Sequence, residues 1–265
     1  MFVRVNGITM HVQVRGDAEA PPVLLLHSLG TAFQLWDGVA ELLSAGYRPV
    51  QIDLRGHGLT SVPRGSYTID GMAADVVGAL ETMDVAEVHV VGVSLGGAVA
   101  QRLGVMMRGR VLSLVLIGTA MSFPPRALWL DRAAAVRSAG IEQFVESSVA
   151  RWVSAASLHT PIADGLRAML RRTDPEGYAA SAEALAAVNL ADVAGSLDMP
   201  VLVMVGEADH STPIWVASVL RDAISGARLK TLPGLAHLPP AEAPVEVAAA
   251  IVEFIDSLPR RHGEH

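Results

Sequence analysis

Residues 88–104 read Val-His-Val-Val-Gly-Val-Ser-Leu-Gly-Gly-Ala-Val-Ala-Gln-Arg-Leu-Gly, and this stretch decides the fold. An apolar run at 88–91 predicts a buried strand, and a helical pattern opens at Ala98. Between them lies Gly-Val-Ser-Leu-Gly, the G-x-S-x-G pattern of a sharp strand-to-helix turn that displays a serine hydroxyl above a sheet. A glycine-rich turn that contains a serine by chance would need neither a buried strand before it nor a helix after it. We therefore predict Ser94 as a catalytic nucleophile.

Buried strands and amphipathic helices alternate on both sides of this turn. Continuous apolar runs at 23–26, 47–52, 88–93, 111–117 and 201–205 predict strands buried on both faces, and helical periodicity appears at 69–84, 95–108 and 213–224. A hairpin with Asn6-Gly7 at its turn precedes them, while a strand at 227–231 and a helix at 242–257 close the chain. The alternation predicts an α/β fold with a mostly parallel central sheet and helices on both faces.

Residues 122–190 break this alternation. They contain Ala-, Arg- and Leu-rich amphipathic stretches interrupted by prolines, with no strand-like run. We predict about four helices here, which form a helical lid over the carboxyl edge of the sheet. The predicted domains are a core at 1–121 and 191–258 and the lid at 122–190, followed by a flexible tail at 259–265.

The composition excludes several classes of protein. The chain has 265 residues, of which 51% are hydrophobic and 18% charged, and this favours one large folded domain over a disordered chain. Because it has no cysteine, disulfides and thiolate metal sites are excluded. The net charge of −7 disfavours nucleic acid as a partner. No signal peptide or transmembrane run is visible, so we expect a cytoplasmic protein without membrane contact; a homo-oligomer stays open.

A serine hydroxyl becomes a strong nucleophile only beside a base that an acid orients. In the chain order typical of this turn, the acid and then the base follow the serine. Asp209 follows the apolar run 201–205, and His237 lies in the loop after the final strand. Both stand at carboxyl ends of strands, the edge at which Ser94 is displayed. We predict Asp209 as the acid and His237 as the base, with Glu207 as a competing carboxylate.

Two backbone N–H groups are the predicted oxyanion donors: that of Leu95, directly after the nucleophile, and that of Leu29, in the turn His27-Ser28-Leu29-Gly30. The loop Asp53-Leu54-Arg55-Gly56-His57-Gly58 combines acid, base and cation, but we interpret it as a structural loop pinned by an Arg–Asp hydrogen bond. No phosphate-binding glycine loop occurs, and no histidine pair before the C-terminal tail has metal-ligand spacing. Neither a nucleotide cofactor nor a metal is therefore expected.

Together these motifs resemble the α/β-hydrolase superfamily over essentially the whole chain. The resemblance rests on the serine turn, the Asp-x-Arg-Gly-His-Gly loop at 53–58, Gly-Glu-x-Asp at 206–209 and the late Gly-x-x-His at 234–237. It implies the α/β-hydrolase fold with a helical lid insertion.

A closer resemblance is to 3-oxoadipate enol-lactonases, enzymes of bacterial aromatic compound catabolism. Three stretches carry it: Ser28-Leu29-Gly30-Thr31 with Trp36-Asp37 downstream, Arg151-Trp152, and Asp174-Pro175-Glu176-Gly177-Tyr178-Ala179-Ala180. It implies cofactor-free hydrolysis of an enol-lactone, with Arg151 and Trp152 in substrate binding and Arg151 paired with a substrate carboxylate. A solvated or lid-bonded arginine is the structural alternative. The chain departs from that family at His27, where the family more often has a small or amide residue, and at 237–244, which is closer to a general esterase pattern.

We therefore predict a serine hydrolase that opens a small lactone ring, most like 3-oxoadipate enol-lactone, through an acyl-enzyme. A carboxylesterase, a lactonase for another ring such as an acyl-homoserine lactone or a macrolide, and a carbon–carbon bond hydrolase stay open alternatives. A small-molecule receptor that keeps the triad but barely turns over is the alternative from a different class. The expected partner in every case is a small molecule, above all an ester or lactone substrate.

Overall fold

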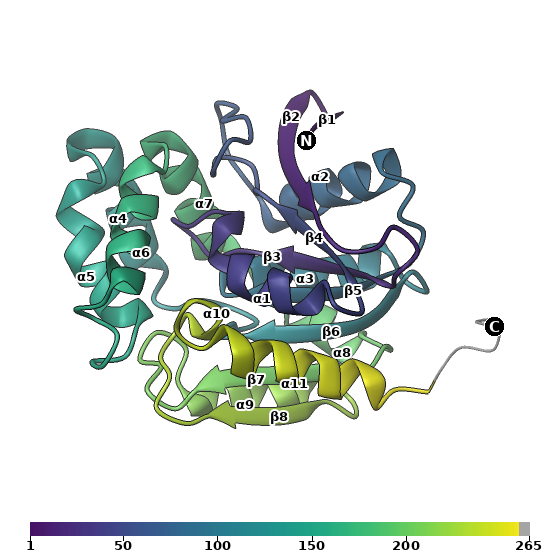
Figure 1. Cartoon of the computed structure of the whole chain (residues 1–265). Coiled ribbons are helices and arrows are strands. Elements are labelled where there is room, and N and C mark those ends of the chain that lie inside the picture. The colour runs from purple at the N-terminus through teal and green to yellow at the C-terminus, as the bar shows by residue number, and fades with distance from the viewer. Residues whose placement is uncertain (260–265) are drawn as a thin grey trace.

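The computed structural model describes residues 1–259, which form a single central sheet with helices around it (Figure 1). The sheet has eight strands in the order β1-β2-β4-β3-β5-β6-β7-β8. Strand β2 pairs antiparallel with β1 and with β4, whereas every pair from β4 to β8 is parallel. The predicted mostly parallel α/β sheet is confirmed.

The strands agree closely with the apolar runs. They are β1 (Phe2–Val5), β2 (Ile8–Val14), β3 (Pro22–Leu26), β4 (Arg48–Ile52), β5 (Val88–Val93), β6 (Val111–Ile117), β7 (Val201–Gly206) and β8 (Arg228–Leu232). Every residue of β5 and β7 is buried, because helices cover both faces of the sheet there. Asn6 and Gly7 have φ values of 48° and 78°, the left-handed conformations that a two-residue hairpin turn requires.

The helices of the core form two layers. They are η1 (Phe33–Trp36), α1 (Asp37–Leu43), α2 (Ile69–Thr82), α3 (Leu95–Met106), α8 (Ala191–Gly195), α9 (Ile214–Ala223), α10 (Pro239–Glu242) and α11 (Pro244–Asp256). Helix α1 packs against α11 on the side of the sheet that faces the viewer in Figure 1, while α2 packs against α3, and α8 contacts both α3 and α9. The helical segment at 33–43 was not predicted from the sequence.

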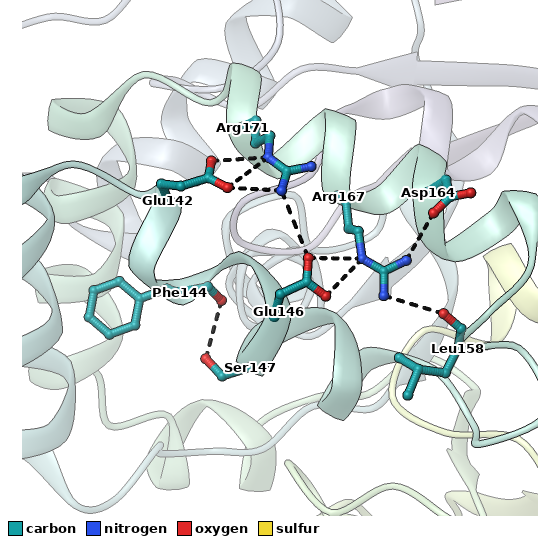
Figure 2. A network of polar contacts seen from close by, with 8 residues as sticks. All are labelled: Glu142, Phe144, Glu146, Ser147, Leu158, Asp164, Arg167 and Arg171. Atoms are coloured by element: carbon teal, nitrogen blue, oxygen red, sulfur yellow. Dashed lines mark hydrogen bonds and ion pairs between the residues drawn. The ribbon is translucent and has the colours of Figure 1, made fainter.

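Four helices occupy the segment predicted as a helical lid: α4 (Arg126–Ala139), α5 (Glu142–Trp152), α6 (Pro161–Arg172) and α7 (Pro175–Ala187). They gather beyond one end of the sheet, with α4 packed against α7 and α5 against α6 (Figure 1). Arg171 donates to Glu142 and Arg167 donates to Glu146, so that ion pairs tie α6 to α5, while Arg167 also donates to Asp164 within α6 (Figure 2).

The described residues end at Pro259, so the tail predicted at 259–265 lies outside them apart from that proline. Within residues 1–259, no helix combines the length and the apolar character needed to cross a membrane.

Candidate active site

Ser94 lies in the tight turn between β5 and α3. Its φ of 54° falls in the left-handed region that non-glycine residues rarely adopt, and its N–H donates to the carbonyl of Ile117 at 2.9 Å. A Cβ atom on Gly92 would lie 2.3 Å from the carbonyl oxygen of Gly96, and one on Gly96 would lie 2.3 Å from that of Leu26. Only glycine fits at both positions, because α3 approaches the sheet so closely. The G-x-S-x-G pattern therefore has the backbone geometry of a displayed serine.

Asp209 holds His237 in a fixed orientation. Nδ1 of His237 lies 2.9 Å from Oδ2 of Asp209, and the two side chains are only 5% and 0% exposed. Oδ1 of Asp209 accepts the N–H groups of Ser211 and Thr212 at 2.7 and 2.9 Å. The Thr212 hydroxyl donates to Oδ2 at 2.8 Å. These bonds prevent rotation of the carboxylate, so Nδ1 of His237 carries the imidazole proton and Nε2 is left as an acceptor.

The environment keeps Asp209 ionised. Burial by itself would raise the pKa of Asp209, but the facing charge of His237 and the hydrogen bonds from His237 and Thr212 outweigh it and hold the pKa below its ordinary value. The competing carboxylate, Glu207, instead accepts the N–H of Gly234 at 2.9 Å. Asp209 is therefore the carboxylate that orients the imidazole.

Ser94 and His237 line one cavity of about 60 Å³ at the carboxyl ends of the strands. Leu29 contributes to the wall on the core side, and Arg151 and Trp152 contribute to the wall from the insertion. The structure thus brings together the predicted nucleophile, base, oxyanion loop and substrate-binding residues. The volume accommodates only about two water molecules, so a substrate needs the insertion or its side chains to move.

Two backbone N–H groups beside this cavity lack a partner. Neither Leu29 nor Leu95 donates its N–H to an acceptor within residues 1–259, although both residues are buried. Unpaired N–H groups are rare in protein interiors. Leu29 lines the cavity, and Leu95 follows Ser94 as the first residue of α3. Both groups are available to an oxyanion that forms at the serine.

Two arginines of the insertion also line the cavity: Arg151 on α5 and Arg132 on α4. Among the described residues neither forms an ion pair with a carboxylate, whereas Arg167 and Arg171 nearby are both paired (Figure 2). Arg132 donates to the Tyr178 hydroxyl at 3.1 Å. Partial burial, and next the like charge of Arg132, lower the pKa of Arg151. A bound anion would relieve this repulsion, so the cavity favours a negatively charged ligand.

Arg132 was missed by the sequence analysis. It is one of three arginines on α4, together with Arg126 and Arg137, and its spacing does not distinguish it from them. Arg137 pairs with Glu176 and Glu183 at the surface. Only the packing of α4 against α7 selects Arg132 as the arginine that reaches the cavity.

The stretch 174–180 combines a structural role with one at the cavity. Oδ1 of Asp174 accepts the N–H groups of Glu176 and Gly177 at 2.8 and 3.2 Å, which caps α7. A Cβ atom on Gly177 would lie 2.1 Å from the carbonyl oxygen of Gly56, so the start of α7 presses against the loop at 53–58. This contact positions Tyr178, which is 1% exposed, at the cavity wall.

Hydrogen bonds join the insertion to the loop that carries the histidine. The carbonyl of Trp152, at the end of α5, accepts the N–H of Leu238 at 2.8 Å. Glu242 adds a second link, because its carboxylate accepts the N–H of Ser154 at 2.7 Å and that of Ala236 at 2.9 Å. Trp152 therefore positions the insertion against the loop that carries His237 as well as lining the cavity.

The expected Arg–Asp bond within the loop at 53–58 is wrong. Arg55 donates to Asp75 on α2 at 2.5 Å. Asp53 is fully buried and accepts the N–H of Phe33 at 2.8 Å, and its other oxygen lies 2.9 Å from Nδ1 of His11. The two side chains of the expected pair thus have separate partners, Asp53 at the start of η1 and on β2, and Arg55 on α2. The loop keeps a structural role, through different partners.

A larger hollow, of about 680 Å³, lies at the amino ends of the strands and is lined in part by Tyr47 and Asp256, which are hydrogen-bonded at 2.6 Å. None of the predicted site residues borders it. Ligands of open α/β sheets bind at the carboxyl ends of the strands, so we take the smaller cavity as the candidate site. Within residues 1–259, no three His, Asp or Glu side chains form a group that could hold a metal ion.

Known proteins share this architecture. The model of the alpha/beta hydrolase family matches residues 23–250. The 3-oxoadipate enol-lactonase 1 of Acinetobacter baylyi is 28% identical over 97% of both chains. The crystal structure of the enol-lactonase from Burkholderia xenovorans LB400 gives a TM-score of 0.94 at 29% identity, covering 97% of this chain and 100% of that one. A thermophilic esterase from Thermogutta terrifontis with malate bound gives a TM-score of 0.90 at 28% identity over 96% of each chain.

Proposed function

This chain belongs to the alpha/beta hydrolase family, and from that premise we propose that it is a serine hydrolase that opens a small enol-lactone ring, most like 3-oxoadipate enol-lactone. The observation that carries the proposal is the fixed Asp209–His237 pair, which shares a cavity with Ser94 and with two arginines that have no carboxylate partner within residues 1–259. The pair supports nucleophilic catalysis, and the arginines support a substrate that bears a carboxylate.

In the proposed reaction, Nε2 of His237 takes the proton of the Ser94 hydroxyl as Oγ attacks the lactone carbonyl. The N–H groups of Leu29 and Leu95 receive the oxyanion. The ring C–O bond then breaks, and His237 returns the proton to the leaving enol, which tautomerises to a ketone while its carbon chain stays attached as the acyl group. Water activated by His237 attacks the acyl-enzyme, releasing the oxo acid and restoring Ser94.

The substrate class follows from the cavity wall. An enol-lactone of this kind carries one free carboxylate, which can accept charge-assisted hydrogen bonds from Arg151 and Arg132. The enol-lactonase relatives and the esterase with bound malate support a small acidic ligand in this fold. A function in aromatic compound catabolism and a cytoplasmic location belong to the same proposal.

We assign residues 122–190 to a lid domain over a core formed by 1–121 and 191–258. The insertion leaves the core after β6 and returns before β7, and its side chains form part of the cavity wall at the carboxyl edge. Because the cavity holds about two water molecules, we expect substrate binding to require movement of these helices or of their side chains.

The test is the loss of ultraviolet absorbance of 3-oxoadipate enol-lactone with purified protein, measured beside an aryl butyrate ester. We expect fast lactone turnover, weak ester turnover, and neither in Ser94→Ala. Arg151→Gln should raise KM for the lactone by about ten- to a hundredfold, because it removes a charge-assisted hydrogen bond, and should leave KM for the uncharged ester nearly unchanged. Arg171→Gln, on the same insertion but paired at the surface, is the matched control.

A carboxylesterase is the second candidate, and the aromatic side chains of the cavity favour it. Phe123, Trp129 and Trp152 give the wall an apolar part that would suit an uncharged acyl chain. Ester turnover that requires Ser94, without lactone turnover, would select this candidate and discard the lactone.

A further inference from the structure

The carbonyl group of Ser28 is held by three hydrogen-bond donors. Nδ1 of His27 donates to it at 2.8 Å, the Thr31 hydroxyl donates at 2.8 Å, and the Thr31 N–H donates at 3.2 Å. Ser28, His27 and Thr31 are all buried, with exposures of 1%, 0% and 0%. A carbonyl oxygen in a turn ordinarily needs one partner or a water molecule. Three buried donors on one oxygen therefore fix the direction of this peptide group.

The peptide that Ser28 shares with Leu29 carries the candidate oxyanion donor. The bond is trans, because the one cis peptide bond within residues 1–259 is Pro124–Pro125. In a planar trans peptide the C=O and N–H bonds point in opposite directions. The donors that hold the Ser28 oxygen in the interior thereby direct the Leu29 N–H the other way, toward the cavity that Leu29 lines.

The tautomer of His27 is determined by its second nitrogen. Nε2 accepts the N–H of Leu54 at 3.0 Å, so the proton of the neutral ring sits on Nδ1 and is available to the carbonyl of Ser28. His57 acts on the next peptide from the opposite side, as an acceptor: its Nε2 accepts the N–H of Gly30 at 3.1 Å. The N–H of Gly30 is thus engaged in the interior, which leaves the N–H of Leu29 as the donor that this turn offers to the cavity.

We infer that His27 and Thr31 are positioning residues that orient and polarise the Leu29 N–H for the oxyanion, with His57 withholding the neighbouring N–H of Gly30. The inference rests on the proposed serine hydrolase function, because an oxyanion forms only if Ser94 attacks a carbonyl. Donors on a peptide oxygen also draw electron density from its nitrogen, so they strengthen the N–H as a donor. The gain is largest in the transition state, in which the negative charge is localised on one oxygen.

The test compares Thr31→Val, which keeps the shape but loses the hydroxyl donor, with Thr31→Ser, which keeps the donor. With an aryl butyrate, Thr31→Val should lower kcat by about tenfold and leave KM within about twofold, and Thr31→Ser should restore most of the rate. The upper limit for this loss of kcat is the roughly hundred- to thousandfold loss that follows when a whole oxyanion donor is removed. Affinity for an alkyl trifluoromethyl ketone, which adds the serine oxygen to give a tetrahedral oxyanion, should fall in parallel with kcat/KM. Affinity for butyrate, which forms no such adduct, should not change.

The two proposals fail in different ways. If the unsubstituted protein shows no hydrolysis that Ser94→Ala abolishes, the proposed function is lost. If that activity is present but a folded Thr31→Val keeps full kcat and full affinity for the ketone, or if Thr31→Ser fails to restore them, the positioning role is wrong. A purely structural role would lower the melting temperature without this parallel change.

A second measurement needs no substitution and applies even if Thr31→Val does not fold. Amide NMR of the unsubstituted protein should show the N–H signals of Leu29 and Leu95 moving downfield when the trifluoromethyl ketone binds. The Gly30 signal should move little, because its N–H stays bonded to His57. A large shift at Gly30 with none at Leu29 would overturn the inference.

Discussion

Replacement of Asp209 by Asn is expected to reverse the tautomer of His237. One atom of the new amide must face the N–H groups of Ser211 and Thr212, and only its oxygen can accept from both. The amide NH₂ is then directed at Nδ1 of His237, where a carboxylate oxygen now lies at 2.9 Å. Nδ1 must become the acceptor, so the imidazole proton moves to Nε2. A protonated Nε2 cannot take the proton of Ser94.

The expected loss is about 10⁴-fold in kcat, equivalent to about 5.5 kcal/mol of barrier, as for other triads whose acid is made neutral. KM should change little, because the amide is nearly isosteric and reaches no substrate atom. The assay is steady-state hydrolysis of the aryl butyrate at neutral pH, together with ¹⁵N NMR of the imidazole. The NMR should show the proton on Nδ1 in the unsubstituted protein and on Nε2 in Asp209→Asn.

Glu207→Gln is the matched control, because it removes the neighbouring charge and keeps an acceptor for the N–H of Gly234. Its kcat should stay within about twofold of that of the unsubstituted protein, since surface charges contribute little. A folded Asp209→Asn that retains a tenth or more of the activity, or a Glu207→Gln that loses it, would contradict this role of Asp209.

Two predictions concern stability. Burial lowers the pKa of His27 to about 4 and, together with the like charge of His27, that of His57 to about 3, whereas both titrate near 6.5 when unfolded. The unfolded chain therefore binds protons first, and the free energy of unfolding should fall by several kcal/mol between pH 6.5 and about 3; a melting temperature that is flat over this range in pH-dependent calorimetry would contradict the burial argument. Gly30→Ala should destabilise the protein by roughly 1–3 kcal/mol more than Gly226→Ala in urea unfolding. Both glycines have φ near +73°, but only at Gly30 would the new Cβ meet another side chain, with Cδ1 of Leu170 at 2.6 Å. Equal losses in the two variants would show that the contact with the insertion is loose.

The strands and long helices could be predicted because each is a local pattern. The run at 88–93 and the Asn6-Gly7 turn carry their own signals, and the structure confirms them. The segment at 33–43 could not be predicted in this way. Its eleven residues are divided between η1 and α1, so no helical period extends far enough to be recognised. Its buried residue Trp36 is placed by packing against the core rather than by periodicity.

The residues of the candidate site also differ in whether a local pattern or the tertiary packing places them. Ser94 and His237 could be predicted because chain order and strand ends restrict where a nucleophile and a base can lie. The choice between Asp209 and Glu207 could not be made with certainty, since both follow β7 and only the backbone path decides which carboxylate turns inward. Arg132 could not be predicted at all, because its place at the cavity depends on how α4 packs against α7.

Asp209 combines two roles, that of a turn cap and that of the proposed triad acid. A carboxylate after a strand is either a turn cap or a catalytic acid when the two roles are considered separately. Here the N–H groups of Ser211 and Thr212 that make Asp209 a cap also immobilise Oδ1, and the Thr212 hydroxyl occupies part of Oδ2. The position that remains on Oδ2 faces His237. The same reasoning applies to His27, whose bond to the Leu54 N–H is structural but determines which nitrogen can donate to Ser28. In both side chains the structural contact selects the geometry, and the proposed chemistry depends on it.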